Sequence, residues 1–281
     1  MPTERLAVSA ITLDFGNTLV RVDRASLRGV VEETTDVLAG RGIVADRADF
    51  LAAWAEERDR QFREEVPEFR EVDIPQRAVR VLARLRGMAP PPAEARWDDA
   101  AAAGFADAGE VEAVVEAYSA AFVGRMTPYA DATSTLERLS GRGFALAILS
   151  NWPLALTVDR FAEAHGWLPF LRSIVVSQRV GTIKPHPSIF RAAEEALGVD
   201  GETGSRILHV GDDWAADVVG AARAGWRTAY LRDRQVDTPL PTSEPGDDFV
   251  AEAPVVADLV IDELSDLDAL VQRATAEGAR A

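Results

Sequence analysis

The sequence contains no cysteine, a single lysine, three histidines and no apolar run near the roughly 18 residues that span a bilayer. Without cysteine the chain forms no disulfide framework and has no thiol nucleophile. The histidines lack the spacing of a zinc site. The first residues also lack the charged-then-apolar pattern of a signal peptide. We therefore expect a soluble, cytoplasmic protein.

Positive charge is also scarce. The 281 residues include 46 aspartates and glutamates but only 30 lysines and arginines, which gives a formal net charge of -16 at pH 7. Nucleic-acid binding requires basic surfaces that displace counterions from phosphates, so this balance argues against such a partner. A small phosphorylated substrate needs only one local positive cluster or a metal ion. The hydrophobic fraction of 47% is sufficient for a core.

The single lysine, Lys184, stands in GTIKPHPSIF (residues 181–190), whereas every other basic residue is arginine. Such a bias suggests that genome composition replaced lysine almost everywhere else. The ammonium group is a compact point charge, which the planar guanidinium of arginine does not reproduce. We interpret Lys184 as a functional residue; the alternative is retention by chance.

Short apolar runs alternate with helical patterns over most of the chain. The runs are typical of buried parallel strands; they cover residues 6–13, 144–150, 173–177, 206–213 and 227–231. Helices are predicted between them at residues 130–143, 186–198 and 215–225, and a last strand and helix over 257–271. This alternation predicts an α/β fold with a doubly wound parallel sheet.

Residues 20–127 interrupt the alternation, because no strand pattern occurs there. Amphipathic helices are predicted at residues 26–42, 46–66 and 110–124, and prolines break the pattern at 89–99. The last helix places Val111, Val114, Val115, Tyr118 and Phe122 on one stripe. We expect a core domain formed by residues 1–19 and 128–281 and an inserted all-helical cap domain, residues 20–127. Residues 237–254 are predicted to form an acidic, proline-broken loop.

Polar residues follow the predicted strands. In doubly wound sheets ligands bind beyond the carboxyl ends of the strands. Taken singly, each of these residues is more typical of a turn or a helix cap than of a catalyst. Their occurrence at successive strand ends predicts one common site, formed by Asp14, Ser150, Asn151, Lys184, Asp212, Asp213 and Asp217.

Four segments, in this order, resemble the motifs of the haloacid dehalogenase-like (HAD) superfamily: LDFGNTLV, ILSNW, GTIKPHPSIF and VGDDWAAD. The resemblance covers most of residues 7–231, and the helical insertion is similar to the cap domain of that family. It implies a Rossmann-like core and a phosphatase that hydrolyses a small phosphorylated metabolite. It also implies that Asp14 is the nucleophile and forms an aspartyl-phosphate.

The resemblance implies a role for each motif residue. Mg²⁺ would be held by Asp14, the backbone carbonyl of Gly16 and Asp212, with Asp217 as a ligand or a partner through water. Ser150 and the backbone of Asn151 would hold phosphate oxygens. Lys184 would stabilise negative charge in the transition state. Asp213 is either part of this shell or a surface turn.

Gly16 departs from the pattern of the family. Most of its phosphatases carry a second aspartate here, which protonates the leaving oxygen; such help contributes about 10²–10⁴-fold. Asp23, His186 or a cap residue could replace it, although Asp23 and His186 are each more typical of a helix start. His165 and His209 are expected to pack or cap. Trp152 and Trp214 either line the entrance or pack in the core.

Three alternatives to this phosphatase activity arise within the family. Dehalogenases of the family also lack the second aspartate, but they work without metal and do not need both Asp212 and Asp217. Phosphonate-cleaving members use a cap lysine, which this chain does not have. A phosphate-binding or regulatory protein with weakened turnover is the third alternative, because Gly16 replaces the usual acid.

Overall fold

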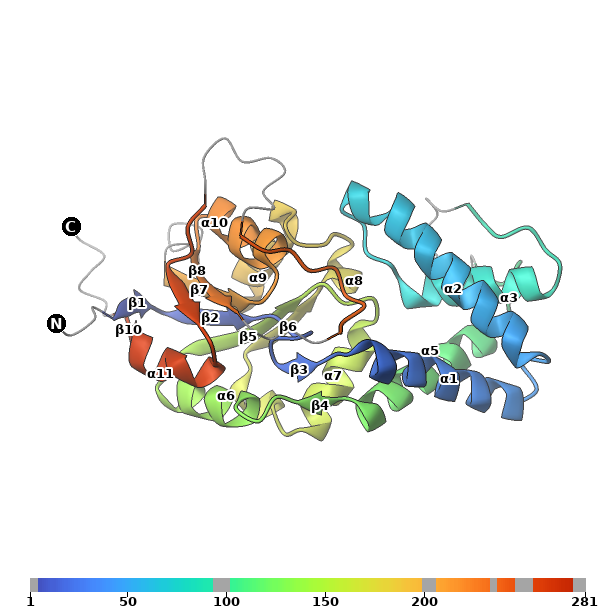
Figure 1. Cartoon of the computed structure of the whole chain (residues 1–281), viewed down its shortest axis with the longest axis horizontal. Helices are drawn as coiled ribbons and strands as arrows, with labels where there is room; N and C mark the ends of the chain where they lie inside the picture. Colours follow the sequence, from blue (N-terminus) through green and yellow to red (C-terminus); the bar gives the residue numbers. More distant parts are fainter. Residues whose placement is uncertain (1–4, 93–101, 199–205, 233–236, 246–254, 275–281) are drawn as a thin grey trace.

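The computed structural model describes residues 5–92, 102–198, 206–232, 237–245 and 255–274. Figure 1 shows a sheet with flanking helices on one side of the molecule and a separate group of helices on the other. Among the described helices, none is long and apolar enough to cross a bilayer.

Six strands form the main sheet, in the order β6-β5-β2-β7-β8-β9. Every neighbouring pair is parallel, as the apolar runs predict. The first strand of this sheet therefore lies inside it, with later strands added on both sides, which is the doubly wound arrangement. The strands are β2 (Ala10–Leu13), β5 (Ala145–Ser150), β6 (Ser173–Val176), β7 (Ile207–Gly211), β8 (Arg227–Leu231) and β9 (Leu259–Ile261).

Helices cover both faces of the sheet. Successive residues of β5 point to opposite faces, so Leu146 and Ile148 belong to one buried cluster, whereas Ala147 and Leu149 belong to another. The surrounding helices are α6 (Ala132–Gly141), α7 (Ala155–Ala164), α8 (Ser177–Val180), α9 (Pro187–Leu197), α10 (Gly220–Arg223) and α11 (Leu267–Leu270). Single turns complete them: η2 (Leu168–Phe170), the π-helical η4 (Trp214–Val219) and η5 (Leu264–Asp266).

The inserted helices are α1 (Arg24–Gly40), α2 (Arg47–Glu64), α3 (Ile74–Leu85) and α5 (Ala108–Arg125), with the turn η1 (Val66–Glu68). They pack on one another beside the sheet (Figure 1). The stripe predicted on α5 is buried at Val111, Val114, Tyr118 and Phe122, whereas Val115 is only half-buried. We call these helices the cap; its exact limits at residues 20 and 127 stay a prediction.

The structure corrects three expectations. The run predicted as one strand over 6–13 divides into β1 (Leu6–Val8) and β2, and β1 pairs outside the main sheet with β10 (Val271–Arg273). Residues 20–127 were expected to lack strands, yet β3 (Val20–Arg21) pairs with β4 (Thr127–Pro128). The helix predicted over 215–225 begins as the π-helical turn η4. Each correction rests on pairing between distant segments or on local backbone winding, which residue patterns do not report.

The proline-broken loop is described only over residues 237–245, which we call the strap; residues 246–254 lie outside the described residues, as do 93–99 of the earlier proline-rich stretch. The strap crosses from the core towards the start of α1 (Figure 1). The Arg24 amide donates to Asp237 O at 2.6 Å, and the Trp214 amide donates to Ser243 O at 3.0 Å. The strap therefore joins the first cap helix to the turn η4.

Candidate active site

Lys184 lies at the centre of the predicted site, and its side chain is buried. Its Nζ donates to Asp14 Oδ1 at 2.7 Å, to Asp217 Oδ1 at 2.6 Å and to the Leu149 carbonyl at 2.8 Å. Three acceptors thus surround one nitrogen, which matches the three donors of an ammonium group. Burial alone would lower the pKa of Lys184, but Asp14 and Asp217 raise it above its usual value. The lysine is therefore a fixed positive charge.

Asp14, Asp212 and Asp217 lie close together, each offering a carboxylate oxygen within 4.8 Å of the others. Burial raises the pKa of Asp14, and burial with the charges of Asp14 and Asp217 raises that of Asp212 well above its usual range. Burial also acts against ionisation of Asp217, yet Lys184 and His209 hold its pKa below the usual value. One lysine does not compensate three carboxylates. This excess of negative charge, with an all-oxygen donor set, fits a hard divalent cation such as Mg²⁺.

Thr18 orients Asp212, a contact that the sequence motifs did not indicate. Its Oγ1 donates to Asp212 Oδ1 at 2.9 Å, and the threonine is fully buried. Thr18 follows Asp14 by four residues on the same loop, and that loop folds back so that Leu19 and Val20 amides both bond the Phe15 carbonyl. The first and fourth motifs are therefore tied together directly. The hydroxyl residue four positions after Asp14 is the sequence signal from which this contact with Asp212 could have been predicted.

His209 was predicted to be a packing residue because it lies inside a strand. The structure also gives its ring two polar contacts. Its Nε2 lies 3.0 Å from Asp217 Oδ1, and its Nδ1 lies 2.8 Å from Thr12 Oγ1. Burial, followed by the charge of Lys184, lowers the pKa of His209, so the imidazole is neutral. With its proton on Nε2 it donates to Asp217 and accepts from Thr12. It is thus a positioning residue beneath the carboxylate cluster.

Gly211 gives Asp217 the room for this contact. A Cβ at position 211 would lie 2.0 Å from Asp217 Oδ2, so no other residue fits there without moving the carboxylate.

The π-helical turn that carries Asp217 begins two residues beyond Asp212, and Asp213 caps it by accepting from the Ala216 amide at 2.8 Å. The second acidic residue of the motif is therefore a helix cap in contact with the site. Burial and Asp217 raise its pKa to about 6.

Ser150 is the last residue of β5 and Asn151 follows it, and β5 pairs with β2, the strand that leads to Asp14. The Asn151 side chain brackets the Lys184 backbone: Nδ2 donates to Lys184 O at 3.0 Å, and Oδ1 accepts from Lys184 N at 2.6 Å. Ser150 Oγ is buried and has no hydrogen-bond partner among the described residues. An unpaired buried hydroxyl at this point suits an anionic ligand such as phosphate.

Asp23 and His186, the candidates for a missing acid, both begin helices. Asp23 Oδ1 accepts from the Ser26 amide at 2.7 Å at the start of α1. His186 accepts from the Ser188 amide at the start of α9.

Trp152 is buried and lines the site cavity, whereas Trp214 packs edge-on against Tyr230. His165 packs against Phe161, with ring centroids 4.2 Å apart.

Gly16 lies against the strap. A Cβ added there would meet Leu240 Cδ1 at 2.8 Å and Trp152 Cζ3 at 3.2 Å. The strap is held in place by Asn17, whose Nδ2 donates to Thr238 Oγ1 at 3.1 Å. The space beside Gly16 is thus already filled by apolar side chains, so a longer residue requires at least the Leu240 side chain to shift.

A cavity of about 610 Å³ opens in front of the carboxylates, between the core and the cap. Its polar part includes the cluster residues Asp14, Lys184, Asp212 and Asp217. Its walls are mostly apolar and come from the cap, the strap, the loop after β5 and the loop that carries Lys184: Leu27, Phe62, Val66, Phe69, Val72, Trp152, Ile183, Pro239, Leu240 and Pro241. Arg58, Glu71, Arg77 and Tyr118 add polar groups from the cap.

A parallel α/β sheet that presents an aspartate, a lysine and an acidic loop to a cavity beneath a helical cap defines a class of hydrolases. The family model that matches residues 8–225 is described as a haloacid dehalogenase-like hydrolase, and this chain belongs to that family.

Curated relatives include phosphatases. A glyceraldehyde 3-phosphate phosphatase of Methanopyrus kandleri is 34% identical over 43% of this chain and 51% of its own length. The pyrimidine 5'-nucleotidase YjjG of Escherichia coli is 32% identical over 44% of this chain and 53% of its own length. The chain therefore spans about half the length of the curated relatives it matches.

Solved structures show the same fold. A 2-haloacid dehalogenase from Pseudomonas syringae pv. Tomato DC3000 superposes with a TM-score of 0.63 and 21% identity, covering 94% of this chain and 97% of that one. At this identity the likeness concerns architecture, and the side chains of the site are the guide to chemistry.

Proposed function

We propose that this protein is a Mg²⁺-dependent phosphatase that hydrolyses a small phosphorylated metabolite through an aspartyl-phosphate on Asp14. The observation that carries the proposal is the burial of Lys184 between Asp14 and Asp217, beside a third carboxylate, at the base of a cavity. The sequence relatives named as phosphatases support the same reaction class.

The residues divide the chemistry between them. An oxygen of Asp14 attacks phosphorus, the bond to the substrate oxygen breaks, and water then cleaves the aspartyl-phosphate and returns the free carboxylate. Lys184 holds Asp14 in place and offsets negative charge as it develops on the phosphoryl oxygens. Ser150 Oγ and the Asn151 amide would bind those oxygens. The imidazole of His209 keeps Asp217 directed towards the lysine.

Mg²⁺ would be held by Asp14, Asp212 and the carbonyl of Gly16, with Asp217 nearby. When bound, it supplies positive charge that reduces the repulsion between the Asp14 carboxylate and the phosphate dianion. The raised pKa values of Asp14 and Asp212 support this, because a cation would favour the ionised forms that burial disfavours.

The leaving oxygen receives its proton without a carboxylate at position 16. Alcohols with high pKa values leave poorly without such help, so we expect turnover to fall steeply as the leaving-group pKa rises. A flat dependence would indicate that another group supplies the proton.

The test is hydrolysis of p-nitrophenyl phosphate and of a broad panel of phosphorylated metabolites by the purified protein. We expect activity with Mg²⁺, its loss with chelator, and a loss of at least about 10³-fold in Asp14→Asn without unfolding. Release of chloride from 2-chloropropionate, insensitive to chelator, would support the dehalogenase alternative. Ligand binding without turnover on any ester would support a regulatory protein.

A further inference from the structure

Arg77, on α3, is a buried cation without an ion pair to any carboxylate of the described residues. The residue is 5% exposed, and it lines the cavity in front of Asp14. Its Nε donates to Gln61 Oε1 at 2.8 Å, and its guanidinium lies 5.1 Å from the centroid of the Trp54 ring. In the described part of the chain no Asp or Glu oxygen lies within ion-pair distance of it.

The other two buried arginines of the cap do form ion pairs. Arg60 bonds Glu57 and Glu65, both at 2.8 Å, and Arg80 bonds Glu57 at 2.6 Å. Glu65 is thereby engaged by Arg60 and forms no ion pair with Arg77, although its charge acts to raise the pKa of Arg77. A buried charge without a counterion is strongly destabilising. Among the described residues, carboxylates form ion pairs with Arg60 and Arg80 but not with Arg77.

Glu71, the cap carboxyl that lines the same cavity, is also occupied. Its Oε1 accepts from the Val72 amide at 2.7 Å, and its Oε2 accepts from the hydroxyl of Ser177. Burial raises its pKa to about 7. Both oxygens of Glu71 are therefore engaged in other hydrogen bonds and neither forms an ion pair with Arg77, although the charge of Glu71 acts to raise the pKa of Arg77.

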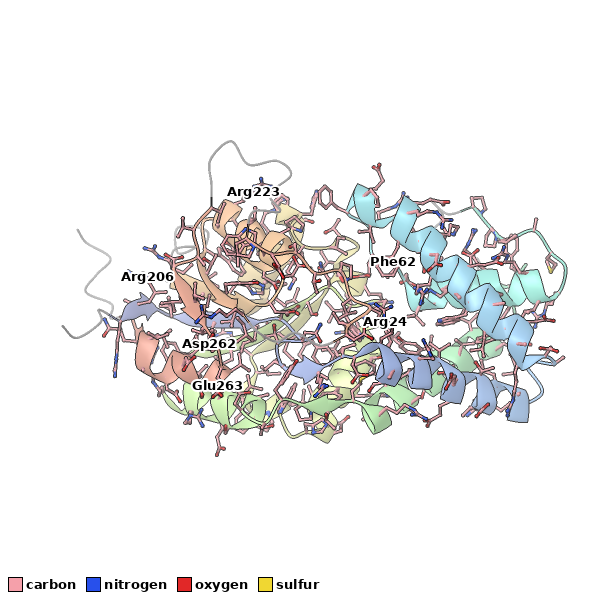
Figure 2. The ribbon with its side chains drawn as sticks, viewed as in Figure 1. Arg24, Phe62, Arg206, Arg223, Asp262 and Glu263 are labelled. Carbon is pink, nitrogen blue, oxygen red and sulfur yellow. The ribbon has the colours of Figure 1, made fainter. Side chains whose placement is uncertain are left out.

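Tyr118, on α5, adds a second polar group to this wall of the cavity. It is 4% exposed and lines the cavity. Burial raises the pKa of Tyr118 to about 12, so the hydroxyl stays neutral and can donate. Apolar side chains lie on the walls between the cap and the carboxylate cluster, among them Phe62 near the core-facing end of α2 (Figure 2).

Building on the proposed function, we propose that Arg77, with Tyr118, binds a second oxyanionic group on the organic part of the substrate. The guanidinium matches the paired oxygens of a carboxylate or a phosphate and binds them through two parallel hydrogen bonds. The substrate class is then a phosphate monoester of an alcohol that also carries a carboxylate or a phosphate, with an apolar stretch between the two groups. Closure of the cap would enclose both charges.

The test uses phosphonates, which the enzyme does not hydrolyse. Calorimetry on the full chain with Mg²⁺ compares ω-carboxyalkylphosphonates of three to eight methylenes with their uncharged carboxamides. At the best length we expect the carboxylate to bind about 10- to 100-fold more tightly, the range of charge-assisted hydrogen bonds. Alkane bisphosphonates of the same lengths show whether the second group is a carboxylate or a phosphate.

Variants test whether Arg77 is the residue that causes the preference for the charged ligand. In Arg77→Met the preference for the charged ligand should fall to about 2-fold or less, and Arg77→Lys should retain only part of it. Arg84→Met is the matched control, because Arg84 is on the same helix but is paired with Glu56 and lies outside the cavity lining; its preference should equal that of the wild type. Equal binding of carboxylate and carboxamide at every length by the wild type would overturn the inference, whether or not Arg77→Met folds.

The two proposals fail in different ways. Absence of phosphatase activity, with the phosphonate preference intact, would remove the proposed function and retain the anion site. Phosphatase activity with no preference for a second charge would retain the proposed function and remove the anion site.

Discussion

At the scale of single residues, Lys184 explains why one lysine occurs in a chain that otherwise uses arginine. Its nitrogen has three acceptors from three segments: Asp14, Leu149 and Asp217. A guanidinium spreads its donors over a plane and needs more space than this buried position offers. The ammonium also lies against the proposed nucleophile, so position and charge matter together.

We expect Lys184→Arg to lower kcat by at least about 10²-fold, although it keeps the charge, because the wider group displaces Asp14 or Asp217. Lys184→Met should lose as much activity and also about 3–5 kcal/mol of unfolding free energy, since it leaves two buried carboxylates without a cation. Steady-state kinetics and urea denaturation measure both effects. Arg179→Lys, a change at an exposed ion pair, is the control. Activity near wild type in Lys184→Arg would contradict this account.

The second prediction at this scale concerns Gly16. A Cβ there meets Leu240 and the buried Trp152, so Gly16→Ala should destabilise the fold by about 1–2 kcal/mol. In a Leu240→Ala background the same change should cost less, because the closest neighbour is removed. A double-mutant cycle by denaturation measures the coupling. Additive effects would show that the strap does not press on Gly16 in solution.

At the scale of elements, a helix start accounts for Asp23, which the sequence analysis considered as a replacement acid. Asp23 caps α1 through the Ser26 amide, and Asp46 caps α2 through the amides of Ala48 and Asp49. The hydrogen bond from Ser26 lowers the pKa of Asp23, so the ionised cap is the stable form. A carboxyl that is held ionised in this way is a poor proton donor at neutral pH.

Asp23→Ala should therefore lower the free energy of unfolding by about 1 kcal/mol, and Asp23→Asn, which still accepts the hydrogen bond, by much less. Neither should change kcat. Asp46→Ala is a matched control for the loss of a cap. A large loss of kcat in Asp23→Asn, with stability retained, would identify Asp23 as the proton donor instead.

At the scale of the whole molecule, Glu71 joins the cap to the core. Its carboxyl bonds Ser177 at the start of α8, and Ser177 also accepts from the Trp152 amide at 2.9 Å. Burial raises the pKa of Glu71 from 4.5 to about 7. The folded protein thus binds this proton more tightly than the unfolded chain, so the contribution of Glu71 to stability is full below about pH 4.5 and is lost as pH rises towards 7.

We expect Glu71→Gln, which stays neutral and keeps the shape, to remove this loss. Relative to wild type, its unfolding free energy should rise by on the order of 1–3 kcal/mol between pH 4.5 and pH 7. Denaturation curves across that interval measure the difference. Glu68→Gln, a change at an exposed neighbouring carboxyl, should follow the wild type. Parallel profiles for Glu71→Gln and wild type would show that Glu71 ionises normally.

The sheet and the position of the site could be predicted because their signals are local. An apolar run followed by a polar residue marks both a buried strand and the loop at its carboxyl end, as at Asp14 and Asp212. Thr18, His209 and the strap were missed or undervalued for the opposite reason. Their contacts join residues up to 221 positions apart, as for Asn17 and Thr238, and no spacing along the chain reports them.

The amino-acid sequence by itself determined the succession of the main-sheet strands along the chain, the four polar loops and the absence of an acid at position 16, because these depend on residue type and short-range periodicity. Only the tertiary structure decided that Lys184 has three acceptors, that Leu240 fills the space beside Gly16 and that Arg77 forms no ion pair with the carboxylates in the described part of the chain. These features depend on which side chains meet after the cap, the strap and the sheet have packed. Burial then makes each unpaired charge costly enough to indicate a ligand.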